Sequence, residues 1–371
     1  MADTTEQVHL FTPYTIRGCT FPNRLMVPPM CIFCSENGYV NDGHIGQYFK
    51  YADLGFGGII IEATAIVPQG RISPADLGLW DDDHIEGFKR LAKLAHNLGR
   101  KIGIQLDHAG RKASPNPHGA IKGTDSEKTG KVEWQIEGPS AIAYDSNSDV
   151  PRELTHDDIK QIVKAFGDAA ERAVKAGLDF IEIHGAHGFL IHEFLSPLSN
   201  QRTDEYGGSY ENRTRLVKEV ADEIRKRIPS TMPLFVRISA TDYVQGGWDV
   251  EQSKVLSKEL CTEHGVDIID ISTAGLSADQ VIPPNWDHQL YIAKDIRESA
   301  HIHNTCVGGI CDGTVANKMI TEGYADFVEI GRALFRDAFV PRHVAQDLNL
   351  PVPEYRAPIA WGTRVPRHSK Y

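Results

Sequence analysis

The sequence predicts a single-domain α/β protein built as an eight-stranded parallel (β/α)8 barrel, the TIM barrel. Eight short apolar, β-branched runs alternate with longer stretches of helical periodicity from about residue 24 onward. Such alternation favours a parallel sheet, and eight strand–helix pairs suit a closed barrel better than an open doubly wound sheet. At about 150 residues per domain, 371 residues would allow two domains. Barrels, however, often exceed about 250 residues as one unit, which favours one domain.

Each expected strand is apolar enough to be buried on both faces. The strands are expected at residues 25–28, 58–62, 102–106, 180–183, 234–238, 268–271, 305–307 and 327–330. The helices are expected at residues 43–54, 84–98, 157–176, 210–227, 251–264, 289–300, 313–322 and 336–347. Thr155 and Ser209 are placed as N-caps. Glycines suited to left-handed C-caps follow four helices, at Gly99, Gly177, Gly265 and Gly323.

Two stretches lie outside the alternation. Residues 114–137 are polar and rich in glycine and proline, which predicts a long surface loop, able to act as a lid, after the third strand. Residues 351–371 hold four prolines and show no periodicity. We therefore expect the barrel and an N-terminal extension to occupy residues 1–350, and residues 351–371 to form a tail or an inter-subunit arm.

Charge and composition exclude several classes of protein. Thirty-nine basic residues against fifty acidic ones give a net charge of −11, and no basic run is longer than residues 225–227, so nucleic acid is not an expected partner. The polar start of the chain and the absence of any run of about 18 apolar residues predict neither a signal peptide nor a membrane span. Six cysteines without repeated spacing suit a reducing compartment, and we expect a cytoplasmic protein.

The active site of such a barrel lies at the C-terminal ends of its strands, where polar residues gather in this sequence. Gly308, Gly309 and Gly331 follow the last two strands, and Arg332 opens a short helix expected at residues 332–335. Backbone N–H groups and a guanidinium so placed predict a phosphate site. Tight turns without a ligand are the alternative interpretation of these glycines.

Arg237 ends an otherwise apolar strand, where a charge is costly unless it meets an anion at the barrel mouth. A salt bridge to a neighbouring carboxylate such as Glu182 is the alternative. His184 and His187 leave the fourth strand three residues apart, and they could bind a metal, form a structural pair or donate hydrogen bonds to one ligand oxygen. Neither His108 nor His192 completes a recognised metal set with them, so no metal is predicted.

Cys31 and Cys34 form a lone C-x-x-C, which is weak evidence for zinc or for a redox motif. Cys31 lies beside Met30 at the expected barrel rim. It is better interpreted as a polarisable group that contacts a cofactor.

Short motifs are spread over about residues 10–350. The first are Leu10-Phe11, Asn23-Arg24, Pro29-Met30, Glu62-Ala63, Pro68-Gln69-Gly70-Arg71, Gln105-Leu106, His108-Ala109-Gly110-Arg111 and His184 to His187. The most specific segment runs through Glu193-Phe194-Leu195-Ser196-Pro197, Asn200, Arg202, Asp204, Tyr206-Gly207-Gly208 and Glu211-Asn212-Arg213. Taken together, these motifs resemble the old yellow enzyme family of FMN-dependent ene-reductases. Cys31 and the Gln105 stretch resemble the thermophilic-like subclass in particular.

The resemblance implies FMN at the barrel mouth and NADPH or NADH as the hydride donor, in a ping-pong cycle that reduces enones or quinones. The FMN-binding residues would be Pro29, Met30, Cys31, Ala63, Gln105, Arg237, Gly308, Gly309, Gly331 and Arg332. His184 and His187 would hydrogen-bond the substrate carbonyl. The subclass also implies a homodimer or higher oligomer in which Arg356, or else Arg364, enters a neighbouring active site.

One departure from the family concerns the proton. The family usually has a tyrosine two residues after the second histidine to protonate the substrate, but this chain has Phe189, and Phe33 likewise replaces a second pocket tyrosine. Loss of a positioned general acid typically costs about a hundredfold or more. Water or another hydroxyl such as that of Tyr243 would then supply the proton, or the protein would prefer substrates such as quinones that need no proton from the enzyme. The third outcome is a flavin-dependent desaturase or isomerase. A metal-dependent barrel hydrolase and a barrel that only binds FMN are the remaining alternatives.

Overall fold

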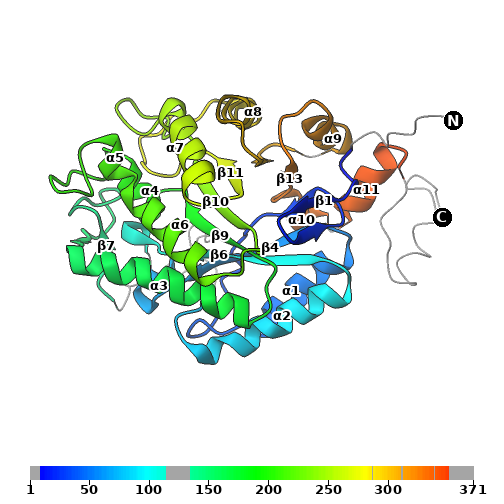
Figure 1. Ribbon diagram of the computed structural model, residues 1–371, viewed down its shortest axis with the longest axis horizontal. Coiled ribbons are helices and arrows are strands. Elements are labelled where there is room, and N and C mark those ends of the chain that lie inside the picture. Colours follow the sequence, from blue (N-terminus) through cyan, green and yellow to red (C-terminus); the bar gives the residue numbers. More distant parts are fainter. Residues whose placement is uncertain (1–8, 114–133, 286, 311, 338, 351–371) are drawn as a thin grey trace.

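The computed structural model describes residues 9–113, 134–285, 287–310, 312–337 and 339–350. Eight parallel strands close into a barrel within this part of the chain (Figure 1). They are β3 (Leu25–Val27), β4 (Gly58–Ala65), β6 (Lys101–Asp107), β9 (Phe180–Gly185), β10 (Leu234–Ser239), β11 (Ile268–Ser272), β12 (Asn304–Val307) and β13 (Phe327–Glu329). Strand β3 pairs with both β13 and β4, which closes the cylinder and confirms the predicted fold.

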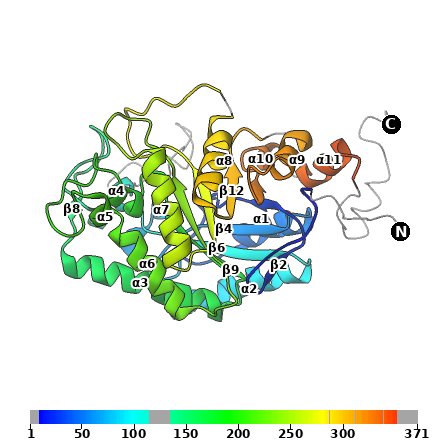
Figure 2. The same cartoon turned by 45° about the horizontal axis from the view of Figure 1, so that its top comes forward.

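Helices cover the outside of the barrel (Figure 2). The eight that follow the barrel strands are α1 (Asp42–Asp53), α2 (Ile85–Asn97), α3 (His156–Lys175), α6 (Arg215–Arg227), α7 (Val250–Glu263), α8 (His288–Ala300), α9 (Gly313–Thr321) and α11 (Val340–Asp347). The Thr155 side chain accepts the N–H of Asp158 and Ser209 accepts that of Asn212, as expected for N-caps. All four predicted C-cap glycines have left-handed φ angles.

Two helix boundaries differ from the prediction. The helix expected over 210–227 is divided into α5 (Tyr210–Arg213) and α6 at Thr214, whose hydroxyl donates to the carbonyl of Tyr210. The helix expected over 336–347 begins only at Val340, because Arg336 ends the short helix α10 (Ala333–Arg336) and Asp337 is extended. That short helix is shifted by one residue from the expected 332–335.

Several short elements were not predicted. They are the antiparallel pair β1 (Tyr14–Ile16) and β2 (Cys19–Phe21), the strand β5 (Leu77–Gly78) beside β4, the parallel pair β7 (Glu137–Gly138) and β8 (Arg152–Glu153), and the helix α4 (Leu190–Leu195). The β1–β2 pair places Phe21 against Phe180, Phe235 and Phe327 at the starts of their strands. This apolar cluster fills the N-terminal end of the barrel, so the C-terminal end remains for a ligand.

No helix in the described ranges is both long and apolar enough to cross a membrane.

Candidate active site

A cavity of about 620 Å³ opens at the C-terminal end of the barrel, a volume in the usual range for cofactor sites. Ten of the residues predicted from the sequence line it, namely Pro29, Met30, Gln105, His184, His187, Arg237, Gly308, Gly309, Gly331 and Arg332. The structure adds Pro28, Val307, Ile310, Glu329, Ala333 and Arg336 to this lining. The strand ends are thus brought together as expected, because parallel strands present their C-termini on one face.

The cavity wall after β12 has no space for side chains. Gly308 has a φ of +116°, and a Cβ there would lie 2.2 Å from Oε1 of Gln289. A Cβ on Gly331 would meet Cγ of Pro28 at 3.3 Å and Sδ of Met30 at 3.4 Å. Bare backbone at two adjacent strand ends, with Arg332 beside it, is a wall that a phosphate can approach closely.

His184 and His187 stand together in the lining, with ring centroids 5.3 Å apart and the planes at 80°. His184 is the penultimate residue of β9, and its Nδ1 is buried with no hydrogen-bond partner in the described residues. His187 has a left-handed φ of +59° and its Nε2 lies 2.8 Å from Oγ of Ser272. Burial and the charge of Arg237 hold the pKa of both imidazoles well below its usual value. Both rings are therefore neutral near pH 7, and each carries one N–H.

The other nearby histidines are held away from this pair. His192 accepts the N–H of Gly188 at Nδ1, and its Nε2 lies 2.9 Å from Oδ1 of Asp242. Burial lowers the pKa of His108 to about 4, and its Nδ1 accepts the N–H of Gly110. Neither ring lines the cavity, so neither completes a metal site with His184 and His187.

Phe189 packs edge-on against His184, with ring centroids 4.9 Å apart. It belongs to a small apolar cluster with Ala63, Ile72 and Ala109, against which Cys31 packs. None of these residues is part of the cavity lining, but Phe189 borders it through His184. Burial, followed by Asp76, raises the pKa of the Cys31 thiol well above its usual value, so the thiol is neutral.

The remaining predicted site residues lie apart from the cavity lining. Phe33 is partly exposed and has a left-handed φ of +51°. Tyr243 contacts the ring of His288 at a centroid distance of 5.7 Å. Cys34, the second cysteine of the C-x-x-C, lies 3.6 Å from Nδ1 of His44, and Cys31 and Cys34 are both free thiols. Arg356, Arg364 and most of the loop predicted at 114–137 lie outside the described residues.

Arg237 forms ion pairs that the sequence did not identify. Its Nη1 lies 3.1 Å from Oδ2 of Asp270 and 3.4 Å from Oε2 of Glu329. The expected alternative partner, Glu182, instead accepts a hydrogen bond of 2.8 Å from Nε2 of Gln105. The strand register explains the difference, because Arg237 is paired with Asp270 on β11 and with His184, not Glu182, on β9.

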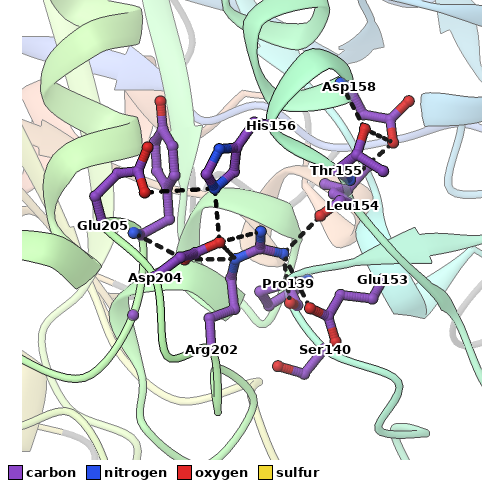
Figure 3. A network of polar contacts seen from close by, with 12 residues as sticks. Pro139, Ser140, Glu153, Leu154, Thr155, His156, Asp158, Arg202, Asp204 and Glu205 are labelled. Carbon is purple, nitrogen blue, oxygen red and sulfur yellow. Dashed lines mark hydrogen bonds and ion pairs between the residues drawn. The ribbon is translucent and has the colours of Figure 1, made fainter.

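The segment with the most specific family motif forms a structural network beside α3 (Figure 3). The guanidinium of Arg202 binds Asp204 at 2.6 Å and donates to the carbonyls of Pro139 and Leu154. His156 lies 2.8 Å from Asp204. Although partial burial opposes it, these hydrogen bonds hold the pKa of Asp204 below its usual value. Because Arg202 already neutralises Asp204, we interpret this network as a support for the loops rather than a metal site.

Two residues in or beside the cavity were not identified from the sequence. Glu329 lines the cavity. The sequence contained a signal for it, because a glutamate in an apolar strand is as unusual as the arginine at position 237. Lys112 donates to the carbonyls of His187 at 2.7 Å and Gly275 at 2.8 Å. Burial lowers the pKa of Lys112 to about 8. Nothing in its local sequence shows that it supports the loop of His187.

Similarity to known proteins assigns this chain to a family. The model of the NADH:flavin oxidoreductase / NADH oxidase family matches residues 9–351. The chain belongs to this family. An NADPH dehydrogenase of Bacillus subtilis is 45% identical over 347 residues, covering 93% of this chain and 96% of the relative. An NADH:flavin oxidoreductase of Gibberella zeae is 41% identical over 365 residues, covering 94% of this chain and 88% of the relative.

Solved structures agree with this assignment. Morphinone reductase superposes with a TM-score of 0.74 at 25% identity, and the match covers 96% of this chain and 93% of that one. Another structure of morphinone reductase, with tetrahydroNAD bound, matches with a TM-score of 0.72, also at 25% identity, and covers 94% of this chain and 93% of that one. This chain is therefore an FMN-dependent NAD(P)H oxidoreductase of the old yellow enzyme type.

The residues present fit FMN. Its phosphate needs donors and close backbone approach, which Gly308, Gly309 and Arg332 would provide. Its ring needs a flat apolar face and polar groups at one edge. Met30 would supply an apolar contact, while Gln105 and Arg237 would supply polar groups, and the Nε of Arg237 is buried with no hydrogen-bond partner in the described residues.

Proposed function

We propose that this protein reduces the activated C=C bond of α,β-unsaturated carbonyl compounds, or quinones, in a ping-pong cycle with NADPH or NADH. The observation that carries the proposal is the pair of neutral imidazoles on the cavity lining. His184 offers a buried ring nitrogen without a partner, and His187 stands beside it, fixed by Ser272. Two such groups suit one carbonyl oxygen better than they suit a metal.

Bound FMN supplies hydride transfer, and the chain's own residues act on the substrate. The imidazole N–H groups of His184 and His187 would hold the carbonyl oxygen, where negative charge develops as the β-carbon is reduced. Removal of one such donor typically costs about 100- to 1000-fold in kcat. Lys112 would keep the left-handed turn at His187 in place through its bond to the His187 carbonyl.

The proton for the α-carbon has no obvious donor, because Phe189 has no hydroxyl. Water entering the cavity or the hydroxyl of Tyr243 would supply it. Tyr243 lies beyond the cavity lining, near His288. A Tyr243→Phe variant separates the two sources, since enone reduction would slow only if Tyr243 is the donor.

The test is an anaerobic measurement of the two half-reactions in the parent and in Phe189→Tyr. We expect NADPH to reduce the bound FMN at the same rate in both. Cyclohexenone should reoxidise Phe189→Tyr at least about tenfold faster, because a positioned acid is restored. Phe33→Tyr is the matched control and should leave the rate unchanged, because Phe189 packs against the ring of His184 whereas Phe33 belongs neither to that apolar cluster nor to the cavity lining. If neither enones nor quinones reoxidise the parent, the proposed substrate class is wrong.

A second candidate function is the desaturation or isomerisation of a metabolite. Desaturation of a ketone would transfer the β-hydrogen as hydride to oxidised FMN and release the α-proton, which Phe189 cannot accept, so water or Tyr243 would take it; an isomerisation would use the same groups to remove and return a proton. Incubation of the FMN-loaded protein with cyclohexanone and oxygen would then yield cyclohexenone. Lack of that product, with enone reduction intact, would favour the reductase.

We also propose that the protein self-associates as a homodimer or a higher oligomer. Light scattering coupled to size-exclusion chromatography measures the mass directly, and a mass of 41.1 kDa would contradict it.

A further inference from the structure

Three carboxylates meet inside the barrel, directly below the cavity. Glu182 comes from β9, Asp270 from β11 and Glu329 from β13, and one oxygen of each lies within 4.8 Å of the others. The residues are at most 1% exposed. Their place on alternating strands of the barrel puts them in one layer of its interior.

Within the described part of the chain, one cation faces this acidic cluster of Glu182, Asp270 and Glu329. Arg237 contacts Asp270 at 3.1 Å and Glu329 at 3.4 Å through the same nitrogen, Nη1. Asp270 also accepts the hydroxyl of Thr305, and Glu182 accepts Nε2 of Gln105. Neither oxygen of Glu329 has a hydrogen-bond partner in the described ranges. Glu329 and Arg237 both line the cavity, so the cluster reaches the cofactor site.

The charges in this layer do not balance if every carboxyl is ionised. Three carboxylates and one guanidinium would leave two uncompensated negative charges in a closed space. Buried ions without a partner cost several kcal/mol each, and such groups bind protons instead. The nearby Cys306 adds no charge, because burial keeps its thiol protonated. Two protons bring the layer to neutrality.

We propose that Glu182 and Glu329 are carboxylic acids in the resting protein and that Glu329 presents its neutral carboxyl group to FMN. Asp270 then remains the carboxylate paired with Arg237, where Thr305 and the guanidinium both stabilise it. When Glu329 is protonated, its hydroxyl group can donate a hydrogen bond to a neighbouring carboxyl group or to the polar edge of the cofactor. Burial first, and then Asp270, raises the pKa of both glutamates well above its usual value, which agrees with this assignment.

A divalent cation is the competing occupant of the acidic cluster. The guanidinium of Arg237 already lies against two of its three carboxylates, and a second cation would be repelled. Metal analysis of the purified protein is therefore part of the test. Stoichiometric metal would overturn the proposal.

The test is infrared spectroscopy of the FMN-loaded protein, which distinguishes protonated carboxyl groups from carboxylates. We expect a protonated-carboxyl band in the parent near pH 7, which Glu182→Gln and Glu329→Gln each reduce. Glu322→Gln, at an exposed position on the end of α9, is the matched control and should leave the band unchanged. A parent without the band, or Glu182→Gln and Glu329→Gln variants that both retain it in full, would overturn the proposal.

The FMN midpoint potential tests the contact with the cofactor. Glutamine is neutral, like the proposed acid. Glu329→Gln should therefore change the equilibrium constant for two-electron reduction of FMN by less than tenfold, which corresponds to about 30 mV in the midpoint potential. A larger rise would mean that an ionised carboxylate had been removed. Glu329→Leu should weaken FMN binding about tenfold or more, and unchanged binding would exclude the contact. This inference needs the cofactor but not the proposed substrate, so a lack of enone turnover leaves it standing.

Discussion

Gly308→Ala tests whether the bare backbone after β12 binds the cofactor. The glycine has a φ of +116°, a region that residues with a Cβ rarely adopt. A methyl group there would lie 2.2 Å from Oε1 of Gln289, well inside contact distance. The substitution therefore strains the backbone and displaces the side chain of Gln289 at the edge of the cavity.

The cost can be estimated from these two contacts. Backbone strain of this kind costs about 1 to 3 kcal/mol. Displacing Gln289 breaks its 2.8 Å hydrogen bond to Thr273, which costs about 0.5 to 1.5 kcal/mol more. Together these give about 1.5 to 4.5 kcal/mol. If about half of that cost falls on the bound state, the FMN dissociation constant rises about 4- to 45-fold.

Fluorescence titration of FMN and thermal unfolding of the FMN-free protein would separate the two effects. Gly323→Ala is the matched control, because Gly323 also has a positive φ, of +71°, but caps α9 away from the cavity, where an added Cβ would meet none of the described residues within 4 Å. We expect the control to lose about 1 to 2 kcal/mol of stability with FMN binding unchanged. Gly308→Ala with the FMN affinity of the parent would refute the reasoning.

Two further predictions concern stability. Burial raises the pKa of Glu193 from 4.5 to about 8, so between these values the folded protein holds a proton that the unfolded chain has released, and stability falls as pH rises. Glu193→Gln removes this loss, and its melting temperature relative to the parent should rise from pH 5 to pH 8; a constant difference would contradict the assignment. Arg202→Ala removes the bonds to Asp204, Pro139 and Leu154 and should cost about 3 to 5 kcal/mol in urea unfolding. FMN affinity should not change, because Arg202 does not line the cavity, and a large loss of binding would show that the network reaches the site.

Periodicity located the barrel strands because each is buried on both faces and bounded by helices, so its apolar run stands out from the flanking sequence. It missed β1, β2 and α4, which are too short to show a period. It also ran through Thr214, where the helix is divided into α5 and α6 and the hydroxyl donates to the carbonyl of Tyr210. Such local competition changes no hydrophobic pattern and so leaves no periodic signal.

The sequence likewise predicted one part of the candidate site and not the other. The chain order alone places His184, Arg237 and Gly308 at strand ends, and the closure of a parallel barrel then makes them neighbours. Whether Phe189, Cys31 and Ala63 line the cavity or support it depends on side-chain packing, which the order of residues does not encode.

The sequence by itself determined the barrel, the family and most of the cavity lining, because these follow from strand order and from residue types at strand ends. Only the tertiary structure decided which carboxylates share the charge of Arg237. That choice depends on strand register, which set Asp270 rather than Glu182 beside the guanidinium and brought Glu329 across the barrel to the same layer. Strand register and barrel closure bring together residues that are far apart in the chain. Electrostatic partners in the barrel interior depend on this proximity in space, which the order of residues does not show.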